Sequence, residues 1–350
     1  MSRESWSEER LFFDKETYFT ALFGALGAAR LSVEMETYIF EPDPTGLRVL
    51  DALRDAARRG VRVRLVVDGV GSWFWIGILR EALGDSGVEF KVYHPVSLFR
   101  TAFARLNRRL HRKVCIVDGK TVFLGSFNIT HRHHRDTGVR LSGPGVRILE
   151  EAFKILWEER FPTRKLLFHE SSRIRLNLTR RFRVRWNREF VRRIREAKHR
   201  VWITNAYFVP PWFLLRALCS AGLRGVDVRL LLPAEPDYRF MKWLSEAYYR
   251  YLLLSGVRVF EYRARFLHAK SILVDEGFAM VGSTNLNHRS LMHDLEVDAE
   301  LGHTESFQAL EEQFKTDLRD STEVREFDPT SGGWGIRLLR WLVIRLRYWA

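Results

Sequence analysis

HRKVCIVDGKTVFLGSFN at residues 111–128 and HAKSILVDEGFAMVGSTN at residues 268–285 are two copies of one pattern. His, Lys, Asp, Gly, Ser and Asn occupy the same offsets in both copies, and the positions between them are mostly apolar. A single HxK is uninformative, whereas six matching polar or glycine positions that recur at fixed spacing are specific. This internal repeat predicts a chain built from two similar halves.

The similarity between the halves extends upstream of both motifs. Three further pairs of segments align, namely 30–40 with 200–210, 57–69 with 221–233, and 86–93 with 255–262. Each half therefore follows one order, which is apolar strand, amphipathic helix, RGV turn, apolar strand, SGV turn, strand and motif.

This order of elements favours an α/β fold. Apolar residues recur at three- and four-residue spacing and predict a helix, namely Leu47, Leu50, Leu53, Ala56 and Ala57. The strands VRVRLVVD and VRLLL are rich in valine and leucine, as expected for strands covered on both faces. We expect the halves to pack as a pseudo-two-fold dimer, because a two-fold axis brings equivalent residues together at the shared interface.

The expected domains are residues 1–165 with the first motif and 166–330 with the second, followed by a C-terminal segment, 331–350. After a linker near 161–172, the segments RIRLNL (173–178) and RFRVRW (181–186) alternate arginine with apolar side chains. This alternation predicts a hairpin with one apolar and one cationic face. The basic residues between Arg173 and Arg200 fit a solvated face and an anion-binding surface equally well.

Charge and cysteine content limit the classes of function. The 350 residues include 57 Lys and Arg against 43 Asp and Glu, a net charge of +14, which indicates an anionic partner such as nucleic acid, acidic lipid or a phosphorylated substrate. Cys115 and Cys219 cannot form a disulfide framework, and there is no CxxC, as is typical of a cytosolic protein. The N-terminus lacks the pattern of a secretion signal, and neither uncharged run (69–79 and 201–215) reads as a membrane-spanning helix. We expect a chain that is soluble or lies on a membrane surface.

Each motif supplies the groups that phosphoryl chemistry requires. Side chains two residues apart on a strand share one face, so His111 and Lys113 project together, as do His268 and Lys270. The Gly-Ser-x-Asn that follows offers a tight turn, a hydroxyl and a carboxamide to phosphate oxygens. Two copies that face one another would form a phosphodiester site without a metal.

The duplicated HxKxxxxDxxxxxxGSxN resembles the signature of the phospholipase D superfamily, and with the flanking repeats it covers most of residues 30–300. Within that superfamily the chain is most similar to bacterial cardiolipin synthases of the branch that lacks N-terminal transmembrane helices. Five segments carry this closer similarity, namely 38–72, 106–119, 135–146, 206–211 and 268–291. The resemblance implies two phospholipase D-type α/β domains, each a mixed β-sheet flanked by helices, with one shared active site.

The resemblance also implies a covalent mechanism in two steps that uses no cofactor and no metal. One motif histidine attacks phosphorus to form a phosphohistidine, and the other protonates the leaving alcohol and then deprotonates the incoming one. We favour His111 as nucleophile and His268 as acid/base, with the reverse assignment open. Four further side chains would clamp the phosphoryl oxygens, namely Lys113, Lys270, Asn128 and Asn285. Ser126 and Ser283 would shape and orient the substrate site.

By the same resemblance, an acidic residue downstream of each motif histidine holds its tautomer. Asp136 follows His111, and Glu296 follows His268, at the expected separation. The motif aspartates, Asp118 and Asp275, are expected to be structural rather than catalytic.

The chain departs from the family pattern at three places. Ser126 stands where many cardiolipin synthases have a second glycine, Asn287 replaces the usual acidic residue, and Asp294 replaces an asparagine. These departures leave phosphoryl chemistry intact and leave the lipid and acceptor preference open.

Two surface segments are candidates for membrane contact. On a helical wheel of residues 331–350 the arginines lie on one arc and the leucines on the opposite arc, which is typical of an interfacial helix on anionic lipid. The alternative is a terminal helix packed on the protein's own core. In SWFWIGIL (72–79), membrane contact and core packing are equal contenders. The cluster of His131, His133 and His134 favours a polar loop beside the active site over a metal site.

Two classes of function follow from these observations. The first is a peripheral phosphatidyltransferase at the cytoplasmic face of the membrane, which joins phosphatidylglycerol to a second lipid alcohol. The second is a phosphodiesterase or nuclease whose basic surface tracks a nucleic acid backbone. Resemblance outside the motifs and the C-terminal segment favour the lipid enzyme, and the oligomeric state stays open.

Overall fold

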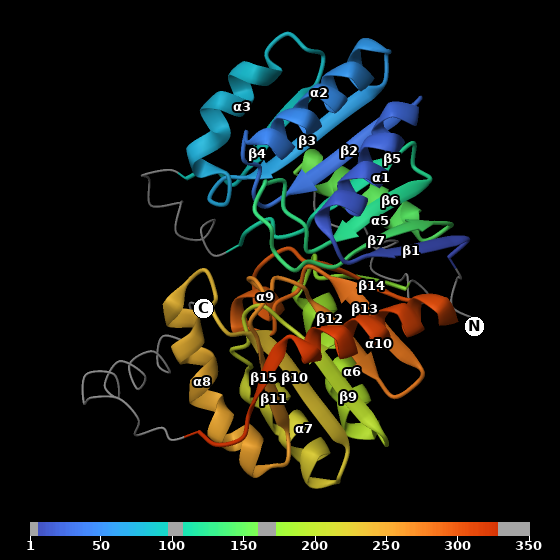
Figure 1. Cartoon of the computed structure of the whole chain (residues 1–350). Helices are drawn as coiled ribbons and strands as arrows, with labels where there is room; N and C mark the ends of the chain where they lie inside the picture. The colour runs from blue at the N-terminus through green and yellow to red at the C-terminus, as the bar shows by residue number, and fades with distance from the viewer. Residues whose placement is uncertain (1–5, 97–107, 160–172, 328–350) are drawn as a thin grey trace.

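The computed structural model describes residues 6–96, 108–159 and 173–327, which form two similar α/β halves, one above the other in Figure 1. The expected boundary at residue 165 and the segment 331–350 lie outside the described residues. In the part of the chain that is described, no helix has the length and apolar composition needed to cross a membrane.

The first half is a seven-stranded mixed sheet with helices on its faces (Figure 1). Its strands are β1 (Glu8–Phe12), β2 (Ser32–Thr37), β3 (Arg62–Asp68), β4 (Glu89–Tyr93), β5 (Val114–Val117), β6 (Thr121–Gly125) and β7 (Gly138–Ser142). Its helices are α1 (Lys15–Ala28), α2 (Pro44–Arg58), the short η1 (Trp73–Trp75), α3 (Ile76–Leu83) and α5 (Val146–Trp157). The strand order is β1-β7-β6-β5-β2-β3-β4, in which β2, β3 and β4 run parallel.

The second half repeats this arrangement in an eight-stranded sheet. Its strands are β8 (Ile174–Leu176), β9 (Arg200–Thr204), β10 (Asp227–Pro233), β11 (Arg258–Tyr262), β12 (Ser271–Val274), β13 (Phe278–Gly282), β14 (Val297–Glu300) and β15 (Ser321–Val324). Its helices are α6 (Arg180–Glu196), α7 (Trp212–Leu223), α8 (Arg239–Leu254), α9 (His288–Met292) and α10 (Thr304–Arg319). The order β14-β13-β12-β9-β10-β11 matches β7-β6-β5-β2-β3-β4 strand for strand, as the sequence repeat predicts.

The predicted hairpin is wrong in its second strand. Residues 174–176 form β8, but residues 181–186 lie in the helix α6. Thr179 caps this helix by accepting a hydrogen bond from the Phe182 amide. Its buried side chains recur at helical spacing, namely Asn187, Phe190, Val191 and Ile194. The alternation over six residues was therefore part of a longer helical pattern.

The predicted helix over Leu47–Ala57 is present as α2, with one difference on its apolar face. Leu50 and Leu53 are fully buried, whereas Leu47 is 50% exposed. Leu47 lies in the first turn, near the Asp43 cap, and points away from the sheet that the later turns cover.

The two motif aspartates fix the same turn in both halves. Asp118 has a left-handed backbone conformation (φ 53°), and its carboxylate accepts hydrogen bonds from the amides of residues 30–32 at 2.7–3.1 Å. Asp275 (φ 49°) does the same with residues 198–200. Each aspartate therefore ties the hairpin of its motif to the start of the neighbouring antiparallel strand, β2 in the first half and β9 in the second.

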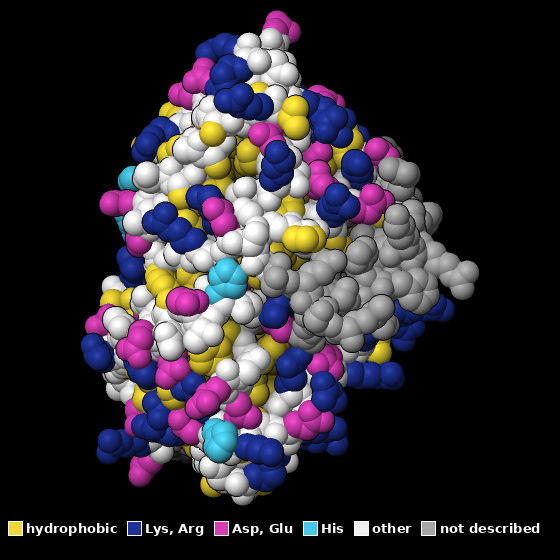
Figure 2. Space-filling view, turned by 90° about the vertical axis from the view of Figure 1, so that its right-hand side faces the viewer, with side chains coloured by type: hydrophobic (Ala, Val, Ile, Leu, Met, Phe, Trp, Pro, Cys, Tyr) yellow, Lys and Arg dark blue, Asp and Glu magenta, His cyan; other side chains and the backbone are white. Residues whose placement is uncertain are grey.

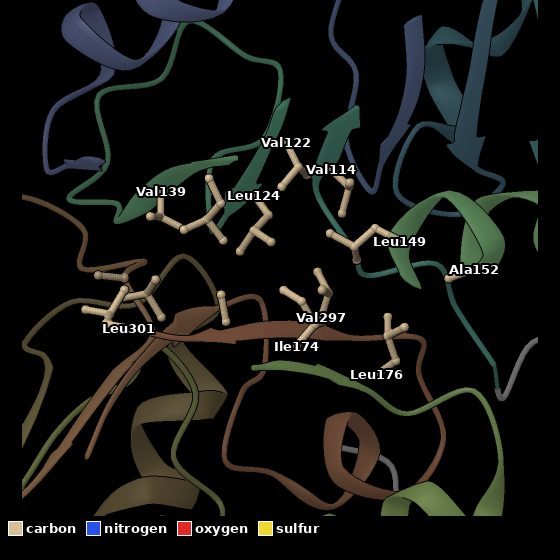
Figure 3. Packing of buried hydrophobic residues seen from close by; sticks show 14 of the residues in the cluster. Val114, Val122, Leu124, Val139, Leu149, Ala152, Ile174, Leu176, Val297 and Leu301 are labelled. Atoms are coloured by element: carbon tan, nitrogen blue, oxygen red, sulfur yellow. The ribbon is translucent and has the colours of Figure 1, made fainter. Parts of the chain in front are cut away.

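One hydrophobic core spans both halves. Val114, Leu124 and Val139 of the first half face Ile174 and Val297 of the second (Figure 3). These side chains are no more than 7% exposed. One face of each sheet packs on the other half through this core. The ends of the two motif strands therefore lie at a common boundary.

Candidate active site

Backbone pairing between the halves brings the two motif histidines to one place. Leu110 forms a bridge with Leu295, and Arg135 forms one with Leu267. The amide of His111 donates to the Leu295 carbonyl (3.0 Å), and the amide of His268 donates to the Arg135 carbonyl (2.9 Å). Each motif histidine therefore lies beside the segment that follows the other motif.

Both imidazoles line a single open cavity at the boundary of the halves. Its volume is about 1020 Å³ with the mouth included. Asn128 and Asn285, the last residues of the two motifs, line it as well. The carboxamide oxygen of Asn285 is buried and has no hydrogen-bond partner among the described residues, so a polar ligand in the cavity would complete its hydrogen bonding.

Each imidazole is paired with a carboxylate of the other half. Nδ1 of His111 lies 3.0 Å from the Glu296 carboxylate, and Nδ1 of His268 lies 2.7 Å from Asp136. The sequence analysis identified both acids but assigned each to the histidine of its own half, and this pairing is wrong. The pairing is crossed because the pseudo-two-fold axis sets each post-motif segment against the opposite motif. A carboxylate at Nδ1 fixes the tautomer and leaves Nε2 toward the cavity.

The motif serines act behind these carboxylates. The Ser126 hydroxyl donates to Asp136 at 2.6 Å, and the Ser283 hydroxyl donates to Glu296. Both serines are fully buried and accept an amide hydrogen bond from the residue that follows the acid. They shape the site by holding the acids, and they are absent from the cavity lining.

The motif lysines are buried next to the histidines. Nζ of Lys113 donates to the His111 carbonyl at 2.8 Å, and Nζ of Lys270 donates to the His268 carbonyl. Burial lowers the pKa of Lys113 to about 8, although Glu296 opposes the shift. Burial and the charge of Lys113 lower the pKa of Lys270 to about 7. Neither lysine is among the residues that line the cavity, so each would act on an anion there through its charge.

Burial and the same lysines keep both imidazoles neutral in the empty cavity. They lower the pKa of His268 to about 3 and that of His111 well below its ordinary value. Burial raises the pKa of Glu296 to about 7, whereas the pKa of Asp136 is held low, against burial, by His268. The dyad of His111 with Glu296 and the dyad of His268 with Asp136 are therefore similar in geometry and different in charge.

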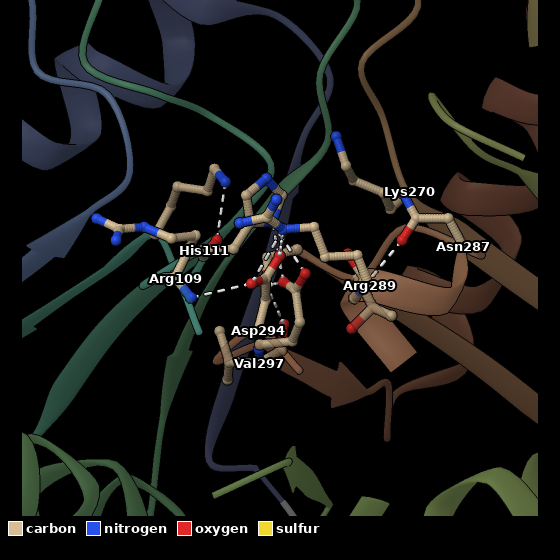
Figure 4. Close-up of polar contacts among 12 residues, drawn as sticks. Arg109, His111, Lys270, Asn287, Arg289, Asp294 and Val297 are labelled. Atoms are coloured by element: carbon tan, nitrogen blue, oxygen red, sulfur yellow. Dashed lines mark hydrogen bonds and ion pairs between the residues drawn. The ribbon is translucent and has the colours of Figure 1, made fainter. Parts of the chain in front are cut away.

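The surroundings of the two histidines also differ. The ring of Tyr38 lies 4.9 Å from that of His111, and Arg289 points toward Asp294 beside it (Figure 4). Asp294 accepts hydrogen bonds from Nε of Arg289 (3.0 Å) and from the Arg109 amide (2.9 Å). Burial raises the pKa of Asp294 to about 7. The sequence singled out Asp294 only as a departure and did not identify Tyr38 or Arg289.

His134 is the member of the predicted histidine cluster that joins the site. Its ring lies 5.8 Å from that of His268, and it lines the cavity, whereas the rings of His131 and His133 lie against each other. His134, Asp136 and His268 have ligand atoms within 4.8 Å of one another, close enough to hold a metal ion. Two of the three, Asp136 and His268, also form a hydrogen-bonded pair with each other.

Comparisons with known proteins give a consistent result. The sequence matches the family described as "Cardiolipin synthase, PLD-like domain" over residues 22–157 and 190–318. Cardiolipin synthase of Clostridium perfringens (strain 13 / Type A) is 30% identical over 348 residues, covering 90% of this chain and 71% of that protein. Cardiolipin synthase of Alkalihalophilus pseudofirmus is 33% identical over 342 residues, covering 91% and 67%.

The fold also matches that of solved structures. The crystal structure of phosphatidylserine synthase from Haemophilus influenzae Rd KW20 superimposes with a TM-score of 0.73 at 13% identity, covering 99% of this chain and 94% of that one. Polyphosphate kinase from Porphyromonas gingivalis gives a TM-score of 0.67 at 14% identity, covering 98% and 54%. At these identities the likeness concerns the fold.

Proposed function

The chain belongs to the cardiolipin synthase family with phospholipase D-like domains, a family of phosphatidyltransferases, and from this premise we propose that it transfers a phosphatidyl group from phosphatidylglycerol to a lipid alcohol through a phosphohistidine. The observation that carries the proposal is the pair of imidazoles that line one cavity, each with its Nδ1 on a carboxylate. This arrangement supplies a nucleophile and a separate acid/base to one phosphorus atom.

In the first step, Nε2 of His111 forms a bond to phosphorus while the bond to the glycerol oxygen breaks. His268 gives its proton to that oxygen, so glycerol leaves as a neutral alcohol. The anionic diester favours the protonated imidazole needed here, because it raises the low pKa that His268 has in the empty cavity.

In the second step, His268 takes the proton of the incoming lipid hydroxyl, whose oxygen bonds to phosphorus and displaces His111. Both steps need stabilisation of charge on the phosphoryl oxygens. Asn128 and Asn285 provide it from the cavity lining, and Lys113 and Lys270 provide it through charges buried next to the motif histidines, so no step requires a metal ion.

Contact with a membrane is part of the proposal. Trp73 is 47% exposed, Phe74 83% and Ile78 48%, whereas Trp75 and Ile76 pack against the core, so part of the aromatic segment 72–79 faces solvent and part faces the core. Figure 1 shows η1 and α3, which carry this segment, on the same side of the molecule as α8 of the other half. Exposed aromatic side chains of this kind favour the interface of a bilayer.

On one face of the molecule, the charged side chains do not form the pattern that is typical of a nucleic-acid-binding protein. On the face drawn in Figure 2, Lys and Arg side chains are interspersed with Asp and Glu. A protein that tracks a nucleic acid backbone typically gathers its basic residues into a patch or stripe. In the same proposal, the chain acts at the cytoplasmic face of the membrane.

The test is incubation of the full chain with phosphatidylglycerol vesicles and, separately, with single- and double-stranded DNA, all in EDTA. We expect cardiolipin and free glycerol from the vesicles, no cleavage of DNA, and loss of at least about 10³-fold in rate for His111→Asn and His268→Asn. Cleavage of DNA without turnover of lipid would assign the chain to the nuclease class. Loss of lipid turnover in EDTA that added metal restores would exclude the metal-free mechanism.

A further inference from the structure

The sequence repeat continues past the two signature motifs to a pair of arginines. Arg132 lies four residues after Asn128, and Arg289 lies four residues after Asn285, each preceded by a histidine. Both arginines line the cavity that contains the two motif histidines. The pseudo-two-fold axis therefore gives the cavity one cation from each half in addition to the buried lysines.

Both arginines are held in place by carboxylates. Nη2 of Arg132 donates to Glu41 at 2.9 Å, and Glu41 also accepts the hydroxyl of Thr130 at 2.6 Å. Arg289 is held through Nε by the buried Asp294 at 3.0 Å. When a carboxylate engages some N–H groups of a guanidinium, the remaining N–H donors point in other directions. A carboxylate that fixes an arginine therefore does not prevent that arginine from binding phosphate.

The two arginines serve different sides of the reacting centre. Arg289 lies on the His111 side, where its charge contributes to lowering the pKa of that imidazole. Arg132 is two residues before His134, which lines the same cavity and whose ring is 5.8 Å from that of His268. Arg132 is also the more open of the two, with 62% of its side chain exposed against 34% for Arg289. The acid/base side, where alcohols leave and enter, is therefore the side of Arg132.

An acceptor lipid such as phosphatidylglycerol brings a second phosphodiester to this side. Its reacting hydroxyl is separated from its own phosphate by the three carbons of the headgroup glycerol, so that phosphate must lie near the reacting centre. We propose that Arg132 binds the phosphate of the acceptor lipid and thereby selects an anionic lipid alcohol over a neutral one. This inference rests on the proposed function, which supplies the donor and the chemistry.

A competition experiment tests the proposal independently of donor binding. Fluorescent phosphatidylglycerol at a fixed low concentration serves as donor, and unlabelled phosphatidylglycerol and 1-butanol compete as acceptors in one reaction. The measured quantity is the ratio of labelled cardiolipin to labelled phosphatidylbutanol. Because both products come from one labelled intermediate, defects in folding, donor binding or formation of that intermediate cancel in the ratio.

We expect Arg132→Gln to lower this ratio by about 10-fold to 100-fold, the range that corresponds to the loss of one charged hydrogen bond. Arg132→Lys should recover part of the ratio, because it keeps the charge and loses the fork of donors. Arg289→Gln should slow both products together. Arg140→Gln is the matched control, because Arg140 forms a comparable ion pair with Glu8 on β1, outside the cavity lining.

An unchanged ratio in Arg132→Gln would overturn the inference, as would equal loss of both products. Wild-type protein that forms neither labelled lipid would instead show that the proposed function is wrong. The two failures are thus distinguishable from the same set of reactions.

Discussion

At the scale of single residues, the two motif lysines are buried cations whose charge changes near neutral pH, as do the charges of Asp294 and Glu296. Lys270, with a pKa of about 7, and Lys113, with a pKa of about 8, are close to the point at which each loses its proton in the empty cavity. A lysine that must be protonated to attract a phosphodiester becomes less effective as pH rises through its pKa. The pH dependence of kcat/KM reports such groups in the free enzyme.

We therefore expect kcat/KM to fall as pH rises above about 7, first through loss of the proton of Lys270. In Lys270→Arg the guanidinium stays charged, so the fall should move to about pH 8, where Lys113 titrates. Lys120→Met, on an exposed turn, is the control and should leave the profile unchanged. A profile of the wild type that stays flat from pH 7 to pH 9 would contradict the assignment.

At the scale of elements, the motif is a hairpin that is anchored at its turn. Asp118 connects the turn between β5 and β6 to the start of β2, and Asp275 makes the equivalent connection to β9. The amides that donate to Asp118 lower the pKa of its carboxyl. The resulting stabilisation is complete at neutral pH and is lost as pH falls below the ordinary aspartate value.

Asp118→Ala should lower the free energy of unfolding by about 1 kcal/mol, because three amides lose a charged acceptor in a partly exposed position. Asp118→Asn should cost less, since asparagine keeps one acceptor oxygen and tolerates the positive φ. Urea unfolding at pH 7 measures both. Asp51→Ala, an exposed aspartate on α2, is the control. A large loss of kcat in folded Asp118→Asn would show that this aspartate is more than structural.

At the scale of the whole molecule, neither half contains a complete catalytic dyad. His111 depends on Glu296, and His268 depends on Asp136, so each imidazole is oriented by a residue of the other half. The shared core and the buried ion pair of Arg135 with Asp317 hold the halves in this register. The active site is therefore a property of the interface.

The crossed dyads give a prediction that separates the two histidines. With a p-nitrophenyl phosphodiester, the leaving group needs no acid, so Asp136→Asn should impair only the second step. We expect its kcat to fall by about 100-fold and a phosphohistidine to accumulate on His111, detectable by rapid quench and mass spectrometry. Glu296→Gln should slow formation of the intermediate without accumulation. Phosphate found on His268 would reverse the assigned roles, and loss of less than twofold in both variants would mean that the dyads are not used.

The sequence alone determined the architecture and the location of the chemistry. Duplicate motifs flanked by duplicate strands could only fold into two equivalent α/β halves, because the apolar pattern of each copy requires the same neighbours. The same repeat identified His111, His268, Asn128 and Asn285, all of which line the cavity.

The tertiary structure decided which residues meet across the interface. The crossed pairing of Asp136 and Glu296, and the charge of Arg289 near His111, depend on how the two halves dock, whereas Tyr38 lies beside His111 within the first half. The structure also has the helix α6 where the sequence predicted a strand, because a short alternation of arginine and apolar residues fits both the strand period and the helix period. A periodic pattern specifies which face of an element is buried, but it does not specify the partner on the other side of that face.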